Sequence, residues 1–489
     1  MATTKVPRKP RREPMSRVDT AWLRMERPTN PMMITGVMML DEPMTLQKLK
    51  QVIQKRFLGY PRFLQKAVET TAGAAWVEDE NFDLDWHVCI SALPGRSDPK
   101  SEKKAFERFV SQLASSPLDK SKPLWQFHLI EKYGGGSAVV TRIHHSYADG
   151  IALVQVLLSL TDTERKPGKD SSLHAAWLKH EGARVDHRVG TVDRYMKLGG
   201  QMLDRGKQMY RDPSLATMLA KEGGEIGREL AAALALCDDP PSMLRGKLGV
   251  SKRVAWAEPL DLDEVKAVGR ACDCTVNDVL MAAAAGALRS YMLERGECLQ
   301  GVTLRATVPV NLRPLEHAKQ LGNHFGLVFL ELPVGEENPI RRVERVAKCM
   351  NDLKNSRQAL VSYGLLAALG MAPAALQGLA LELFSRKATA VATNVPGPQQ
   401  PLYLGGCLMR EMMFWVPQTG SIGIGISILS YNNRVHFGLI ADAKLVPDPD
   451  AVIQRFGPEF EKLLYLSLMG NWDHCLDSIG AGGLVHALD

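Results

Sequence analysis

The sequence predicts an α/β protein built from two halves that are joined by a helical crossover linker. Strand-like and helix-like segments alternate in both halves of the 489-residue chain, and the segment between them is rich in charge and glycine. With 45% hydrophobic residues the chain can bury more than one ordinary core. We expect a basic N-terminal arm over residues 1–14, a first domain over 15–165, a helical linker over 166–250 and a second domain over 251–489.

In the first half, β-branched or alternating apolar runs predict strands, and apolar residues at helical spacing predict helices. Leu46, Leu49, Val52 and Ile53, for example, share one face of an expected helix. The expected strands are residues 32–40, 125–131 and 137–143, and the expected helices are residues 45–57, 103–114 and 151–160.

The linker and the second half repeat these patterns. The expected linker helices, residues 192–209 and 215–236, end before the run Asp238-Asp239-Pro240-Pro241. In the second half the expected strands are residues 253–257, 303–310, 327–332, 423–430 and 434–441, and the expected helices are residues 262–271, 276–292 and 450–465.

Composition restricts the class of partner and the compartment. A net charge of +6 suits anionic partners such as phosphates, CoA or acidic lipid headgroups, or simply aids solubility. No nucleic-acid motif is present. The eight cysteines form no CxxC pair, so we expect no metal site and no disulfide framework, and a reducing cytoplasm. The basic N-terminus lacks an apolar region after it and is interpreted as a solvated arm or a weak contact for anionic membrane, not a secretory signal.

Residues 359–381 carry no charge and are long enough to span a bilayer. Pro373 and three glycines interrupt this segment, so it is expected to form two short helices broken near Pro373. These helices could be buried or lie at a lipid surface, and a true membrane span is the least favoured of the three readings.

The run His144-His145-Ser146-Tyr147-Ala148-Asp149-Gly150 follows an expected strand and precedes an expected helix. Acyl transfer to an alcohol needs a base that works near neutral pH, and a histidine supplies one. We interpret His145 as the general base and Asp149 as a structural residue that turns back to the loop or to an arginine. Gly150 is expected to allow a backbone conformation closed to other residues. A buried histidine pair in a turn is the alternative interpretation.

HHSYADG resembles the active-site motif of the CoA-dependent acyltransferase superfamily. Further segments resemble one member family, the bacterial wax ester synthases/diacylglycerol acyltransferases. They are Met15 to Asp19 with Pro31-Met32-Met33, Phe82 to Val88, Pro123-Leu124-Trp125 (PLW), Thr275 to Val279 (ND), and Asn394 to Pro398 (NVPGP). Ser146 departs from the alanine that is frequent there.

The resemblance implies two α/β domains, each a mixed sheet with flanking helices, and a tunnel between them. A long-chain acyl-CoA would be the co-substrate, with no bound cofactor, and a fatty alcohol or diacylglycerol the acceptor. The products would be wax esters or triacylglycerol. The resemblance also implies that His144 supports the loop while His145 faces the channel.

Other motifs have structural and functional interpretations. Thr275 with Asp278 predicts a capping box, and the amide of Asn277 is a candidate oxyanion donor. Pro123, Leu124 and Trp125 are expected to shape the tunnel. Asn394 to Pro398 predicts a rigid turn that closes the tunnel or ends a strand. His87, His128, His324 and His436 lack metal spacing and receive no chemical role.

Two alternatives to an O-acyltransferase remain: a condensation-domain-like enzyme that acylates an amine, and a non-catalytic protein of lipid surfaces. For the leading hypothesis we expect a cytoplasmic protein associated peripherally with the inner membrane face or with lipid inclusions.

Overall fold

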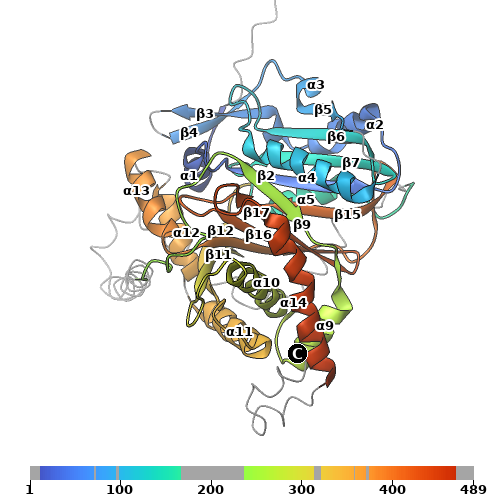
Figure 1. The fold of residues 1–489 in the computed structure, drawn as a ribbon. Coiled ribbons are helices and arrows are strands. Elements are labelled where there is room, and N and C mark those ends of the chain that lie inside the picture. Colours follow the sequence, from blue (N-terminus) through green and yellow to red (C-terminus); the bar gives the residue numbers. More distant parts are fainter. Residues whose placement is uncertain are drawn as a thin grey trace, which may run out of the picture.

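The computed structural model describes residues 12–70, 73–94, 98–166, 236–312, 321–356, 358–369 and 374–469. Two large mixed sheets form the framework, each flanked by helices, and a small sheet lies beside the first (Figure 1). The α/β fold class with two mixed sheets is therefore confirmed.

The first sheet has the strand order β5-β6-β7-β2-β15-β14-β8. Its central strands are buried on both faces, as the nearly continuous apolar run of β2 requires. Val37 and Met39 pack with Phe106 of α4, whereas Met38 packs on the side of Leu153 in α5. The strands are β5 Val88–Ser91, β6 Trp125–Tyr133, β7 Gly136–His144, β2 Met33–Leu40, β15 Cys407–Trp415, β14 Leu402–Leu404 and β8 Thr161–Asp162. The flanking helices are α4 Pro99–Ser115 and α5 Gly150–Ser159.

The second sheet has the order β10-β17-β16-β13-β11-β12, and β9 also pairs with β17. The alanine-rich helix α10 packs against α9, α11 and α14, which lie together in the lower part of Figure 1. The strands are β9 Lys252–Trp256, β10 Leu260–Asp261, β11 Leu304–Asn311, β12 Phe325–Leu332, β13 Ala390–Pro396, β16 Ile424–Tyr431 and β17 Arg434–Asp442. The helices are α9 Leu262–Ala271, α10 Val276–Leu293, α11 Pro339–Asn355 and α14 Pro449–Met469.

The remaining elements lie around the first sheet and between the two sheets. The expected helix over residues 45–57 forms but changes from α-helix to a π-helical turn at Ile53. The small sheet contains β1 Arg12–Pro14, β3 Gln65–Thr70 and β4 Gly73–Glu78. The other helices are α1 Arg17–Met25, α2 Leu46–Val52, α3 Leu84–His87, α12 Gln358–Leu369 and α13 Ala374–Ser385.

The chain crosses between the sheets more than once. Strands β14 and β15 come from the range 251–489, yet β15 pairs with β2 of the first sheet over Trp415↔Thr35 to Met409↔Leu40. The expected second domain therefore contributes two strands to the first sheet. A strand-like sequence pattern shows that a segment is extended, but it does not show which sheet the strand joins.

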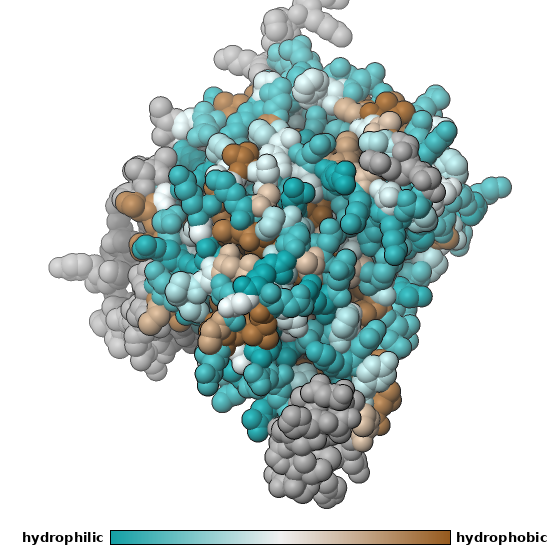
Figure 2. Space-filling model, viewed as in Figure 1, coloured by the Kyte–Doolittle hydropathy of each residue, from teal (hydrophilic) through white to brown (hydrophobic). Residues whose placement is uncertain are grey.

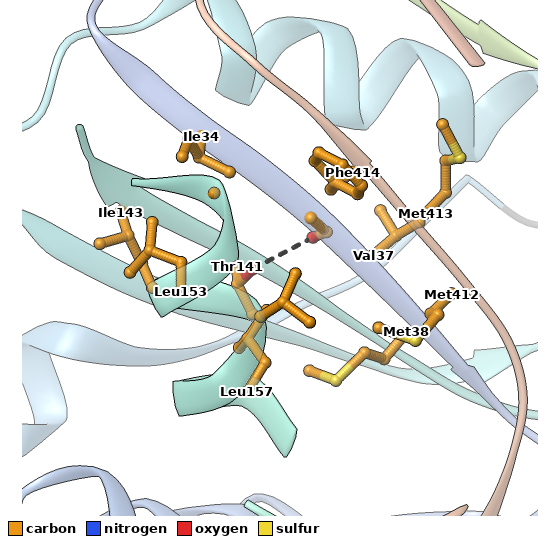
Figure 3. A pocket seen from close by; sticks show the side chains of 13 residues that line it. Ile34, Val37, Met38, Thr141, Ile143, Leu153, Leu157, Met412, Met413 and Phe414 are labelled. Atoms are coloured by element: carbon orange, nitrogen blue, oxygen red, sulfur yellow. Dashed lines mark hydrogen bonds between the residues drawn. The ribbon is translucent and has the colours of Figure 1, made fainter. Parts of the chain in front are cut away.

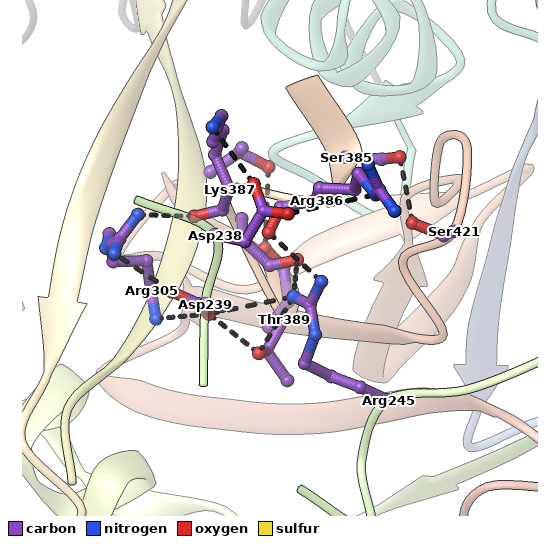
Figure 4. Close-up of polar contacts among 12 residues, drawn as sticks. Asp238, Asp239, Arg245, Arg305, Ser385, Arg386, Lys387, Thr389 and Ser421 are labelled. Atoms are coloured by element: carbon purple, nitrogen blue, oxygen red, sulfur yellow. Dashed lines mark hydrogen bonds and ion pairs between the residues drawn. The ribbon is translucent and has the colours of Figure 1, made fainter. Parts of the chain in front are cut away.

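The expected linker helices lie within residues 167–235, outside the described residues, except for the end at Leu236. Where the chain becomes described again, a polar network holds it to the second sheet (Figure 4). Asp239 Oδ2 accepts hydrogen bonds from Arg305 N at 2.9 Å and Thr389 Oγ1 at 2.7 Å, and Lys387 Nζ lies 2.9 Å from Asp238 Oδ1. The Asp238-Asp239 pair thus ends the linker by joining it to β11 and to the start of β13.

The apolar segment 359–381 forms two helices, α12 and α13, as expected; Pro373 itself lies outside the described residues. Among the helices that the structure describes, no single one is long and apolar enough to cross a membrane. α9 and α10 pass that test only as a pair, which is bent by 96°.

Candidate active site

The loop between β7 and α5 holds the histidine pair at the end of a central strand. His144 N donates to Leu124 O at 3.0 Å, and His145 N donates to Met32 O at 2.7 Å. The two histidine backbones are thus hydrogen-bonded to the residues just before β6 and β2. Because these strands are buried, the position of the loop is determined by the sheet.

His145 is 5% exposed and lies between aromatic rings. Its ring stacks on Trp22 of α1, with centroids 4.2 Å apart and planes 20° apart, and Phe325 lies 5.6 Å away in a tilted orientation. Burial lowers the pKa of His145 to about 4, against the opposite effect of the Asp149 carboxylate. At neutral pH the imidazole is therefore uncharged and able to accept a proton.

His144 is held within the loop and faces Glu26 at the end of α1. Its Nδ1 accepts a hydrogen bond from Ser146 N at 3.1 Å and lies 2.9 Å from Ser146 Oγ. Its Nε2 lies 3.8 Å from Glu26 Oε1. Burial lowers the pKa of His144 to about 3. These contacts give His144 a place in the loop structure, and Ser146 takes part through both its backbone and its hydroxyl.

Asp149 begins helix α5. Its Oδ1 accepts from Ala152 N at 2.9 Å, and its Oδ2 accepts from His324 N at 3.1 Å. The carboxylate therefore caps the helix and also joins the loop to a segment of the second half of the chain.

The expectation for Gly150 is wrong. Gly150 is not among the described glycines with a positive φ, because Asp149 takes the extended cap conformation and Gly150 already begins the helix. A Cβ atom added at Gly150 would have no neighbour within 4 Å. What glycine provides here is open space beside the loop.

Sequence reasoning missed the partner of this loop, Gly322 and Asn323. Ala148 and Gly322 form a parallel bridge, and Asn323 Nδ2 donates to His145 O at 2.8 Å. Asn323 also donates to Asp19 Oδ1 from its backbone at 3.0 Å and its side chain at 2.8 Å. The only signal was a Gly-Asn dipeptide before a strand, which is typical of any turn.

Two residues of the PLW motif form hydrogen bonds near the histidine loop. Leu124 N donates to Tyr147 Oη at 3.1 Å, and Trp125 Nε1 donates to Phe63 O at 2.7 Å. Leu124 and Trp125 are buried. None of Pro123, Leu124 and Trp125 lines the cavity beside the loop, so their described contacts position the loop and do not shape that cavity.

A small apolar cavity, partly open to solvent, lies between the first sheet and α5 (Figure 3). Ile34, Met38, Leu153 and Phe414 point into it, and Gly150 lies on its wall. The cavity therefore lies beside the end of the histidine loop, and its lining is apolar.

The ND and NVPGP motifs meet in a second group. The capping box forms, since Asp278 N donates to Thr275 Oγ1 at 3.3 Å and Thr275 N donates to Asp278 Oδ2 at 2.8 Å. Asn277 Oδ1 accepts from Asn394 Nδ2 at 2.9 Å, and its Nδ2 contacts Met350 Sδ at 4.0 Å. Among the described contacts, none joins Asn277 to the histidine loop. NVPGP ends strand β13.

The parts of the chain that the structure describes contain no group of three or more His, Cys, Asp or Glu side chains arranged to hold a metal ion. The seven described cysteines are free thiols.

Comparison with known proteins places this geometry in a family. The model of the wax ester synthase/diacylglycerol acyltransferase catalytic domain matches residues 15–280, and that of the WS/DGAT C-terminal domain matches residues 321–464. The chain belongs to the wax ester synthase/diacylglycerol acyltransferase family. It is an O-acyltransferase, and the resemblance of its motifs is confirmed.

Relatives and solved structures agree with this assignment. Two Mycobacterium tuberculosis proteins named as diacylglycerol O-acyltransferases are each 28% identical to this chain. The first match covers 80% of this chain and 81% of the relative, and the second covers 93% of this chain and 91% of the relative. The wax ester synthase/diacylglycerol acyltransferase of Marinobacter aquaeolei VT8 matches in structure with a TM-score of 0.63 and 22% identity, covering 93% of this chain and 99% of that one.

More distant structures share the fold alone. A condensation domain of the CDA synthetase has a TM-score of 0.55 at 14% identity, covering 94% of this chain and 96% of its own. Trichothecene 15-O-acetyltransferase from Fusarium sporotrichioides has a TM-score of 0.57 at 12% identity, covering 95% of this chain and 97% of its own. The family match favours the O-acyltransferase over the amine-acylating alternative.

Proposed function

We propose that this member of the family transfers a long-chain acyl group from acyl-CoA to a fatty alcohol or a diacylglycerol, with His145 as general base. The observation that carries the proposal is the neutral, buried imidazole of His145, in the loop that leads to Gly150 on the wall of an apolar cavity. A base of this kind needs no charged partner to be in its active form at neutral pH.

The reaction proceeds without a covalent acyl-enzyme. As the acceptor oxygen attacks the thioester carbonyl, His145 takes the hydroxyl proton, which leaves a tetrahedral oxyanion and an imidazolium. The oxyanion re-forms the carbonyl and breaks the C–S bond. The CoA sulfur leaves with the bonding electrons and takes the proton from His145, so the products are an ester, free CoA and the neutral base.

Two structural roles follow for the loop. His144 is bonded through Nδ1 to Ser146 and faces Glu26, so it supports the loop and leaves proton transfer to His145. Asp149 is engaged by backbone N–H groups of Ala152 and His324, so its carboxylate fixes geometry and does not relay a proton.

The apolar cavity is a suitable place for part of a substrate chain. Every lining side chain except Thr141 is apolar, and burying each methylene there is favourable by about 0.8 kcal/mol. Gly150 leaves open space at the wall of the cavity, whereas a Cβ atom at Gly36 would lie 2.9 Å from Thr141 Oγ1.

We also propose that α13 contacts the surface of a membrane or lipid inclusion. Hydrophilic residues cover most of the face in Figure 2, with apolar residues in separate patches. Leu379 is 65% exposed and Leu383 50% exposed, four residues apart on α13, while Leu381 is buried against the cluster that contains Trp22. Lipid acceptors would then enter near the base, because α1 packs against α12 and α13.

The test is release of free CoA from palmitoyl-CoA by the purified full chain, with hexadecanol or diacylglycerol as acceptor. Acceptor-dependent release that His145→Ala abolishes, and that the control His436→Gln retains, supports the proposal. His436 is a matched control because it is buried but lies on β17 of the second sheet. A folded His145→Ala protein with full activity would exclude His145 as the base, and a folded parent without release would favour the lipid-binding alternative.

A further inference from the structure

Helix α1 presents two side chains to the histidine loop from the same face. Asp19 and Trp22 are three residues apart, so they are neighbours on the helix surface. Asp19 holds Asn323, which holds the backbone of His145, and Trp22 stacks on the ring of His145. The helix thus contacts both the backbone and the ring of one residue.

The buried indole of Trp22 contacts His145 through its ring face and not through its N–H group. Trp22 is 4% exposed, and its Nε1 has no hydrogen-bond partner among the described residues. A buried indole generally directs its N–H to an acceptor. Here the orientation of the indole instead places its face against the imidazole, at 4.2 Å between centroids. The stacking is therefore kept in spite of an unpaired polar group.

An indole face carries negative electrostatic potential and attracts a cation held over it. The neutral imidazole gains little from this attraction, whereas the imidazolium gains more, and more still where water is excluded. Burial opposes formation of the imidazolium, as the lowered pKa of His145 indicates. An aromatic face beside His145 therefore stabilises the ring more strongly once the ring has taken a proton. Such a contact lowers the energy of the transition state more than that of the ground state.

We infer that Trp22 is a positioning residue that orients His145 and stabilises the positive charge which its ring gains during acyl transfer. This inference rests on the proposed role of His145 as the base. The other charged or titratable groups around the ring are Asp149 of the loop, His144 before it, Asp19 of α1 with its electrostatic neighbour Arg62, and His324 beside Asn323. All of these stay unchanged in the variants below.

The experiment compares Trp22→Phe and Trp22→Leu with the parent in CoA release from palmitoyl-CoA and hexadecanol between pH 2.5 and 8, a range that includes the acid limb expected near the pKa of His145. Phe325→Leu is the matched control, because Phe325 belongs to the same buried cluster but meets His145 in a tilted orientation at 5.6 Å. Circular dichroism and thermal unfolding establish that each variant is folded.

Trp22→Leu is expected to lower kcat about tenfold and to move the acid limb of the kcat profile about one pH unit lower, because the imidazolium loses its π partner. For Trp22→Phe, both kcat and the position of the acid limb should lie between those of Trp22→Leu and of the parent. Phe325→Leu should leave the acid limb in place.

A folded Trp22→Leu protein overturns the inference if it retains the parent kcat, or if its acid limb stays or moves to higher pH, as water entering the vacated space would cause. Full activity of His145→Ala would instead refute the proposed function. Loss of activity in His145→Ala without a limb shift in Trp22→Leu refutes this inference alone.

Discussion

Replacing Asn323 by alanine removes the link between Asp19 and the histidine loop. Two hydrogen bonds are lost, Nδ2 to Asp19 Oδ1 at 2.8 Å and Nδ2 to His145 O at 2.8 Å. The backbone bond from Asn323 N to Asp19 remains. A bond to a neutral carbonyl contributes about 1 kcal/mol and one to a buried carboxylate about 1.5–3 kcal/mol, so we expect a loss of roughly 2.5–4 kcal/mol.

For a chain of 489 residues that unfolds as one unit, this loss should lower the apparent Tm by roughly 2–4 °C. The freed carbonyl of His145 should also let the ring depart from its attack geometry, so kcat/KM should fall about tenfold to a hundredfold. Differential scanning calorimetry and CoA release measure the two quantities on the same preparation.

The matched control is Lys266→Ala, which removes an exposed ion pair with Asp263 on α9 and should change stability by less than about 0.5 kcal/mol. If Asn323→Ala keeps the parent Tm and the parent kcat/KM, the Asp19–Asn323–His145 link does not hold the base, and the reasoning fails.

Three further predictions concern pH, the cavity and the ND motif. Burial lowers the pKa of His144, His145 and His436 below the unfolded value of about 6.5, so the unfolded chain binds more protons than the folded chain below that pH. The free energy of unfolding should therefore fall from pH 6.5 toward pH 4, and a Tm that stays constant over this range would contradict the prediction. Gly150→Leu should fill the cavity and lower the rate with palmitoyl-CoA more than the rate with hexanoyl-CoA. An unchanged ratio of the two rates would show that the acyl chain of the substrate lies elsewhere. Asn277→Ala should cost about 1 kcal/mol of stability through its bond to Asn394, and, if that bond is its whole role, kcat should not change. A lower kcat at unchanged Tm would support the oxyanion role.

The local elements could be predicted because their causes are local. The expected strand over residues 137–143 appears as β7, and the capping box of Thr275 and Asp278 forms at the start of α10. The histidine loop was found because its residue types match one chemistry between a strand and a helix. Such features depend on periodicity, caps and motif spacing within a few residues.

Features that join distant parts of the chain could not be predicted. Asn323 lies 178 residues from His145 in sequence, and nothing in the dipeptide Gly322-Asn323 indicates its partner. The expectation for Gly150 failed for a related reason. Glycine can adopt a positive φ, but only the capping geometry of Asp149 shows that α5 begins at Gly150 without one.

The sequence alone therefore determined the α/β class, the position of the histidine loop and, through its motifs, the acyltransferase family. Only the tertiary structure decided that β15 completes the first sheet, that Trp22 stacks on His145 and that Asn323 joins α1 to the loop. The physical reason is that patterning and capping act over a few residues, whereas packing and burial bring together groups that are hundreds of residues apart.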